Sequence, residues 1–158
     1  MNALFSLSIK VLVSFVGLFV LLVAIFILPL FAQEAAFQNP EYAYLKYPIL
    51  IGIYVTLIPF MYAIYQTVQL IDRKEKHPEL TERTLQGFRK ITSSATIIGL
   101  LYLIGMIFLF IQNALHPGIA LAGFFIIAVC ASISAFLTIL RKLLERNIHL
   151  KHENELTI

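Results

Sequence analysis

Histidine and cysteine are the residue types in this 158-residue chain best suited to metal binding or nucleophilic catalysis, and the chain has four histidines and one cysteine. His149 and His152 are close enough in sequence to share one face of a helix, with Glu153 beside them. Two imidazoles fall short of the three or four ligands that hold zinc, so we expect no metal site. Cys130 is the lone cysteine, which excludes a disulfide framework and a cysteine-based metal cluster. Glycine-rich phosphate loops and the HExxH and GxSxG motifs are absent, so the sequence predicts neither an enzyme nor a cofactor.

A second set of distinctive side chains follows one face of the apolar segment 47–71. At about 100° per residue, six residues fall within about 80° of one another, with Tyr62 beside them. They are Tyr47, Tyr54, Ile58, Met61, Tyr65 and Gln69. Hydroxyl and amide groups in hydrocarbon need hydrogen-bond partners, so this tyrosine stripe is expected to face other helices. The stripe lines either a ligand pocket or a packed interface with an aromatic belt at its ends. Its candidate site residues are Tyr54, Met61, Tyr62, Tyr65 and Gln69.

Two prolines affect the helices expected here. Pro59 lies near the middle of segment 47–71 and should kink a helix there, freeing a carbonyl that a neighbour must satisfy. It is therefore a candidate hinge, or else a static kink that aids packing. Pro29 lies near the end of the first apolar run, where it is expected to tighten or end the helix.

The composition requires a membrane. Hydrophobic residues make up 59% of the chain and charged residues 13%, against about 45–50% and about 25% in soluble domains. A helix of roughly 20 apolar residues crosses a bilayer, and four stretches without a charged residue are long enough: 11–32, 47–71, 91–112 and 117–140. The sequence thus predicts an all-α, integral membrane four-helix bundle, a single transmembrane domain over residues 1–158. Spans free of charge disfavour a proton pump or an ion carrier, and direct binding of nucleic acid is not expected.

The placement of basic residues indicates the orientation. Eleven of the twelve Lys and Arg residues lie in the first ten residues, in loop 72–90 or in tail 141–158. Only Lys46 lies in the loop at the opposite side, residues 33–46. Because cytoplasmic loops collect Lys and Arg, we expect a multi-pass protein of the cell membrane with both termini cytoplasmic.

Small residues predict close helix packing in spans three and four. Ala95, Gly99, Tyr102 and Met106 share one face of span three, and Ala95 with Gly99 lets two backbones approach. Similar pairs recur along span four. They fit packing within one chain or in a homo-oligomer. The very short connection before Pro117 requires spans three and four to form an antiparallel hairpin.

The cytoplasmic segments are where a partner would bind. Thr81 is a plausible N-cap for a short helix that continues into span three, from which Arg83, Arg89 and Lys90 reach anionic headgroups or only anchor the span. Span four is expected to continue as a cytoplasmic helix to about Asn147. The last residues prefer strands and would add to a partner's sheet edge or remain a frayed terminus. The candidate partner-binding residues are Leu144, Ile148, Glu155, Leu156, Thr157 and Ile158.

Several runs resemble a known family of small bacterial four-span membrane proteins of unknown function, domain-of-unknown-function family 2975. They are residues 39–48 (NPEYAYLKYP), residues 58–60 (IPF), Tyr65 with Gln66, residues 143–151 and residues 153–158 (ENELTI). The resemblance implies no enzymatic activity and supplies no functional residues. It does imply a neighbour, since members are often encoded beside a very small helix-turn-helix regulator.

Two hypotheses for the function follow. The first is a non-enzymatic membrane sensor or regulator, in which loop 33–46 and the tyrosine stripe respond to a ligand, peptide or membrane stress. Its cytoplasmic loop and tail would engage a small cytosolic DNA-binding regulator. The alternative is a small transport or immunity (resistance) protein with a tyrosine-lined cleft. A membrane enzyme acting on lipid is disfavoured because the chain offers no nucleophile–base pair.

Overall fold

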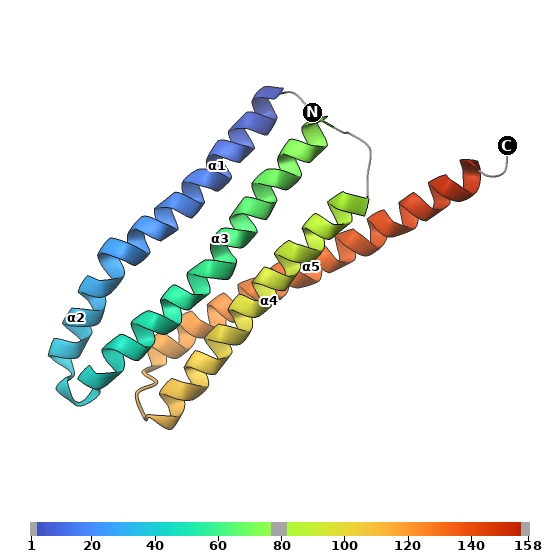
Figure 1. The fold of residues 1–158 in the computed structure, drawn as a ribbon. Helices are drawn as coiled ribbons and strands as arrows, with labels where there is room; N and C mark the ends of the chain where they lie inside the picture. The colour runs from blue at the N-terminus through green and yellow to red at the C-terminus, as the bar shows by residue number, and fades with distance from the viewer. Residues whose placement is uncertain (1–2, 77–81, 156–158) are drawn as a thin grey trace.

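The computed structural model describes residues 3–76 and 82–155, which form long helices and no strand (Figure 1). The elements are α1 (Ala3–Leu22), the π-helical η1 (Val23–Ile27), α2 (Leu28–Gln38), the 3-10 helix η2 (Pro40–Leu45), α3 (Lys46–Lys76), α4 (Glu82–Ile111) and α5 (Pro117–Glu155). Four helical stretches are long and apolar enough to cross a membrane: Leu4–Gln38, Pro40–Arg73, Glu82–Ile111 and Pro117–Ile148. The predicted all-α four-helix membrane bundle is confirmed, and each helix extends at one end or both beyond the apolar run that predicted it.

The extensive helix–helix contacts follow the order of the chain. α1 packs against α3, α3 against α4, and α4 against α5, and Figure 1 shows α3 running between α1 and α4. Across residues 3–76 and 82–155, α1 makes no more than marginal contact with α4 or α5. The bundle is therefore a row of neighbouring helices, and α1 forms one edge of it. We call the end with η2 and the α4–α5 turn the loop end, and the opposite end the tail end.

The apolar residues point mostly outward. Large hydrophobic side chains are exposed along all four spans, and Phe15, Ile58 and Phe125 are each more than 60% exposed. In water such a surface would be costly, whereas in a bilayer it meets lipid tails. The buried apolar residues are few and belong mainly to α3, α4 and α5: Leu50, Phe88, Ala95, Met106, Leu109 and Cys130.

The first span changes its winding near Pro29 and does not end there, which corrects the prediction. Leu28 N–H bonds to Val23 O, an i to i−5 bond of the π-helix η1. The next bond of that pattern would join residue 29 to Ala24 O, but proline has no N–H. Tyr54 on α3 donates its hydroxyl to Ala24 O at 3.2 Å instead. The helix is thus wider over one turn before Pro29. A tyrosine of the next span satisfies the carbonyl that Pro29 leaves without a donor.

Replacing Tyr54 with phenylalanine should destabilise the protein by about 1 kcal/mol, the usual size of a hydrogen bond between membrane helices. The loss should shrink in a Pro29→Ala background, because alanine, unlike proline, has an N–H that can bond within the helix. Thermal unfolding of the four proteins of this double-mutant cycle in detergent measures the coupling. Equal losses with and without Pro29 would show that Ala24 O does not depend on Tyr54.

The α4–α5 pair is the predicted antiparallel hairpin. Its turn has Asn113 in a left-handed conformation (φ 54°), and Ala114 N–H closes the helix end on Leu109 O. Along the hairpin the Thr96 and Ser134 hydroxyls lie 3.3 Å apart. A Cβ placed on Gly99 would lie 3.4 Å from Cys130 Cβ, which bears out the predicted close approach at Gly99. A closer approach, which the spacing did not predict, occurs at Gly123 against Met106.

The tail is helical further than predicted. α5 continues to Glu155, eight residues past Asn147, so the predicted end of the helix is wrong. The charged residues of this stretch favour helix over strand. Leu156, Thr157 and Ile158 lie outside the described residues, as does the expected N-cap Thr81. Pro59 lies inside α3, which is assigned as one helix throughout, and its role as a hinge stays a prediction.

Candidate functional site

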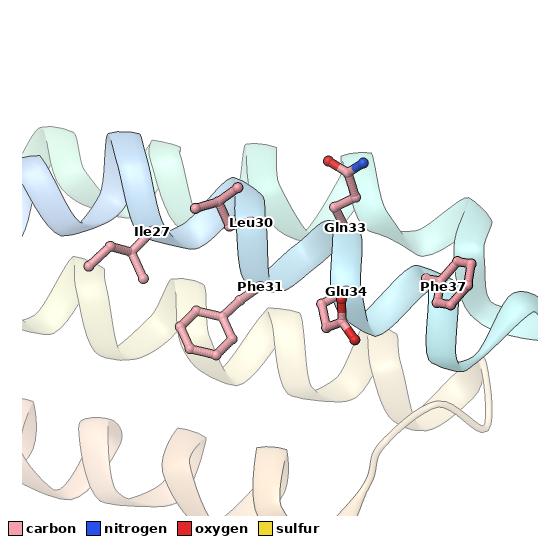
Figure 2. Close-up of a pocket in the computed structure, with 6 residues that line it drawn as sticks. All are labelled: Ile27, Leu30, Phe31, Gln33, Glu34 and Phe37. Atoms are coloured by element: carbon pink, nitrogen blue, oxygen red, sulfur yellow. The ribbon is translucent and has the colours of Figure 1, made fainter.

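The loop end carries an apolar pocket on the surface of η1 and α2 (Figure 2). It is a shallow, open hollow lined by Ile27, Leu30, Phe31, Gln33, Glu34 and Phe37, and three of these side chains, Leu30, Phe31 and Phe37, are each more than 65% exposed. Figure 2 shows Phe31 and Glu34 projecting from the same side of the helix. Glu34 accepts a hydrogen bond from the Gln38 amide at 2.8 Å. The pocket therefore combines aromatic surface with one carboxylate, a combination that suits an amphiphile carrying a positive charge.

Two tyrosines join this end of α2 to the α4–α5 hairpin. Tyr42 in η2 donates its hydroxyl to Asn113 O at 3.1 Å, and Tyr44 donates to Gln112 Oε1 at 3.0 Å. We call these two bonds the tyrosine bridge. It links elements about 70 residues apart in the sequence. A shift of η2 would therefore change contacts in the turn between α4 and α5.

The tyrosine stripe of α3 does not face the other helices as a unit, which corrects the expected orientation. Tyr54 is half-buried and faces α1 through its bond to Ala24, and Met61 is half-buried. Tyr62 and Tyr65, however, are 42% and 56% exposed. The pocket in Figure 2 is lined by none of these residues. The crossing angle between α3 and its neighbours explains why the stripe is only partly covered, because helices that cross at an angle cover one face only along part of its length.

Tyr65 and Gln69 take part in a polar chain that leads to the tail end. The Gln69 amide donates to the Tyr65 hydroxyl, and Arg73 Nη2 donates to Gln69 Oε1 at 3.2 Å. Arg73 Nη1 also approaches the Arg83 carbonyl of α4 at 3.5 Å. Beside this chain, Lys10 of α1 forms an ion pair with Asp72 of α3. Polar contacts thus join α1, α3 and α4 at the tail end.

Sequence reasoning missed the polar groups that are buried between the helices. Thr56 and Gln66 of α3 are 8% and 5% exposed, and the Tyr102 side chain of α4 pairs with that of Thr56. Ser94 is buried as well and donates to Lys90 O at 3.0 Å. Thr56 and Gln66 are two polar residues in an apolar run, a sign that they are buried, but neither belongs to the predicted tyrosine stripe. Buried polar groups of this kind fix how two membrane helices align.

The described residues form no group of three or more His, Cys, Asp and Glu that could hold a metal ion. Tyr54, Thr67, Gln69 and Thr138 make hydrogen bonds within or between the helices. What the arrangement offers is a binding surface at the loop end and a polar network at the tail end.

Comparisons with known proteins agree with this architecture. The model of the family "Protein of unknown function (DUF2975)" matches residues 30–158. The chain is also similar to the "Uncharacterized membrane protein YoaS" of Bacillus subtilis (strain 168), with 32% identity over 160 residues. That match covers 100% of both chains. No solved structure matches the chain.

Proposed function

The chain belongs to the DUF2975 family of proteins of unknown function, and from that premise we propose that it is a non-enzymatic membrane sensor or regulator. In this proposal an amphiphile or peptide binds the loop end, outside the cell. The tail end, in the cytoplasm, engages a small cytosolic DNA-binding regulator. The excess of Lys and Arg at the tail end supports this orientation, with both termini in the cytoplasm.

The tyrosine bridge is the observation that carries the proposal. The apolar pocket lies on η1 and α2, and α2 leads through Asn39 directly into η2, which holds Tyr42 and Tyr44. Their hydroxyls end on residues 112 and 113, next to the start of α5. A ligand that repositions α2 would strain or break these bonds. The binding event would then reach α5 without crossing the bilayer interior.

α5 is the element that would transmit the change. It runs as one helix of 39 residues from Pro117, four residues after the tyrosine bridge ends on Asn113, to Glu155, well beyond the end of the span. Leu144 and Ile148 are half-buried on its extension, while Leu143 is 57% exposed. For a signal to pass, two arrangements of α5 must differ in free energy, and the partner must prefer one of them. Pro59 of α3 is the candidate hinge between the two arrangements.

Replacing Ile148 with glutamate should abolish capture of a cytosolic partner, because a charge on the apolar side of the extension opposes packing against a partner. The matched control is Asn147→Glu, which adds the same charge at the adjacent exposed position. The measurement is a pull-down from native membranes in mild detergent, followed by mass spectrometry. The full chain should capture a small DNA-binding protein, and a chain ending at Leu140 should capture only the background.

Equal capture by the full chain, the Ile148→Glu variant and the shortened chain, with unchanged transcripts, would overturn the regulator proposal. Altered sensitivity to drugs or membrane-active peptides without a change in transcription would favour the alternative, a small transport or immunity protein. In the structure Tyr62 and Tyr65 lie on the exposed surface of α3, an arrangement that gives less support to a tyrosine-lined cleft than to a surface of packing.

A further inference from the structure

Two arginines from different helices meet at the tail end. Arg89 of α4 and Arg141 of α5 line a pocket of about 340 Å³ together with Leu85, Gln86 and Glu145. Figure 1 shows α5 continuing beyond the first turns of α4, which leaves this pocket between the start of one helix and the extension of the other. The two guanidinium groups outnumber the one carboxylate, so the pocket is net positive.

The Arg141 guanidinium is held by an ion pair on its own helix. Its Nε is buried and has no hydrogen-bond partner. Glu145 Oε1 lies 3.1 Å from this nitrogen and forms an ion pair with it, but without the alignment of a hydrogen bond. An acceptor that enters the pocket would therefore meet a guanidinium already positioned by Glu145.

The position along the helices indicates which acceptor this is. Arg141 directly follows the charge-free span 117–140, and Arg89 directly precedes span 91–112 together with Lys90. Both arginines therefore lie at the level where the hydrocarbon ends and the lipid phosphates begin. Leu85, on the wall of the pocket, offers apolar surface to the glycerol or the start of an acyl chain.

We propose that this pocket binds the phosphate of an anionic lipid headgroup, held between Arg89 and Arg141 with Gln86 as a further donor. Arginine suits phosphate because its planar guanidinium can donate two parallel hydrogen bonds. The lipid would fix the first turn of the cytoplasmic extension of α5 against α4. The proposal does not depend on the sensor function.

The test measures lipid binding to the purified, delipidated full chain in an uncharged detergent. Native mass spectrometry counts bound phosphatidylglycerol and, in a parallel series, bound phosphatidylcholine. Phosphatidylglycerol should bind more tightly, and Arg89→Gln or Arg141→Gln should each weaken it about fivefold, as expected for one cation at a membrane surface. Arg146→Gln, the matched control at an exposed position of the same helix, should leave binding within about twofold of the wild type.

A further variant makes the result independent of folding defects. Glu145→Gln removes the only carboxylate of the pocket and should strengthen phosphatidylglycerol binding, an effect that misfolding cannot produce. Millimolar inorganic phosphate should not displace the lipid. Displacement by free phosphate would assign the pocket to a soluble anion and overturn the proposal. An equal loss in Arg146→Gln, or no preference for phosphatidylglycerol, would also overturn it by showing that only diffuse surface charge is involved.

Discussion

Replacing Gly123 with leucine is expected to separate α4 from α5 and to lower the stability of the whole bundle. A Cβ at this position would lie 2.5 Å from Met106 Sδ and 3.0 Å from Met106 Cγ. Met106 is buried, so its side chain cannot swing away without disturbing its neighbours. Overpacking of this kind costs about 3 kcal/mol at its upper end, which corresponds to a fall in melting temperature of about 10 °C for a chain of this size.

The chain carries its own probe for this experiment. Cys130 is its one cysteine and is 9% exposed, close to Gly99 in the same α4–α5 interface. A dye that fluoresces on reaction with thiols will therefore report when the two helices separate on heating. Gly105→Leu is the matched control, because a Cβ at Gly105 meets no atom within 4 Å. The same melting temperature for the two variants would contradict the close contact at Gly123.

The second large effect concerns the sidedness of the protein. Single cysteines introduced at Gln38 and at Asn147, both exposed, should react differently with a membrane-impermeant maleimide on intact cells. Cysteine at position 38 should be labelled, because the distribution of Lys and Arg predicts that the loop end lies outside. Cysteine at position 147 should be protected until the membrane is permeabilised.

The unmodified chain serves as the background for this labelling, since Cys130 is buried within the bundle. Labelling of position 147 on intact cells, with protection of position 38, would reverse the proposed orientation. It would also move the apolar pocket to the cytoplasm and remove the basis of the sensor proposal. The result therefore decides which end of the molecule can meet an external ligand.

Much of the architecture could be predicted because it rests on composition. Four charge-free runs fix four spans, since a charge inside hydrocarbon is costly whatever the packing. The α4–α5 hairpin follows from the few residues between Ile111 and Pro117, which leave no room for another arrangement. The buried positions of Ala95 and Met106 follow from their spacing on one face of a helix.

The predictions that proved wrong concern features that depend on how two helices pack against each other. The orientation of Tyr62 and Tyr65 is set by the crossing of α3 with its neighbours, which periodicity along one helix does not contain. The π turn at Val23–Ile27 depends on Tyr54, thirty residues away, as a donor for Ala24 O. The helical tail runs past the predicted end at Asn147 because the charged residues between Asn147 and Glu155 favour helix.

The chain-order contacts of the helices bear on how the protein is made. During synthesis α3 emerges when α1 is already available to pack against it, α4 follows onto α3, and α5 follows onto α4. No helix has to wait for a distant partner, so assembly can proceed step by step with translation and membrane insertion. A chain that lacks α1 would lose one edge of the row and still keep the α3–α4 and α4–α5 contacts, whereas loss of α4 during insertion would remove the helix against which α5 packs among the described residues.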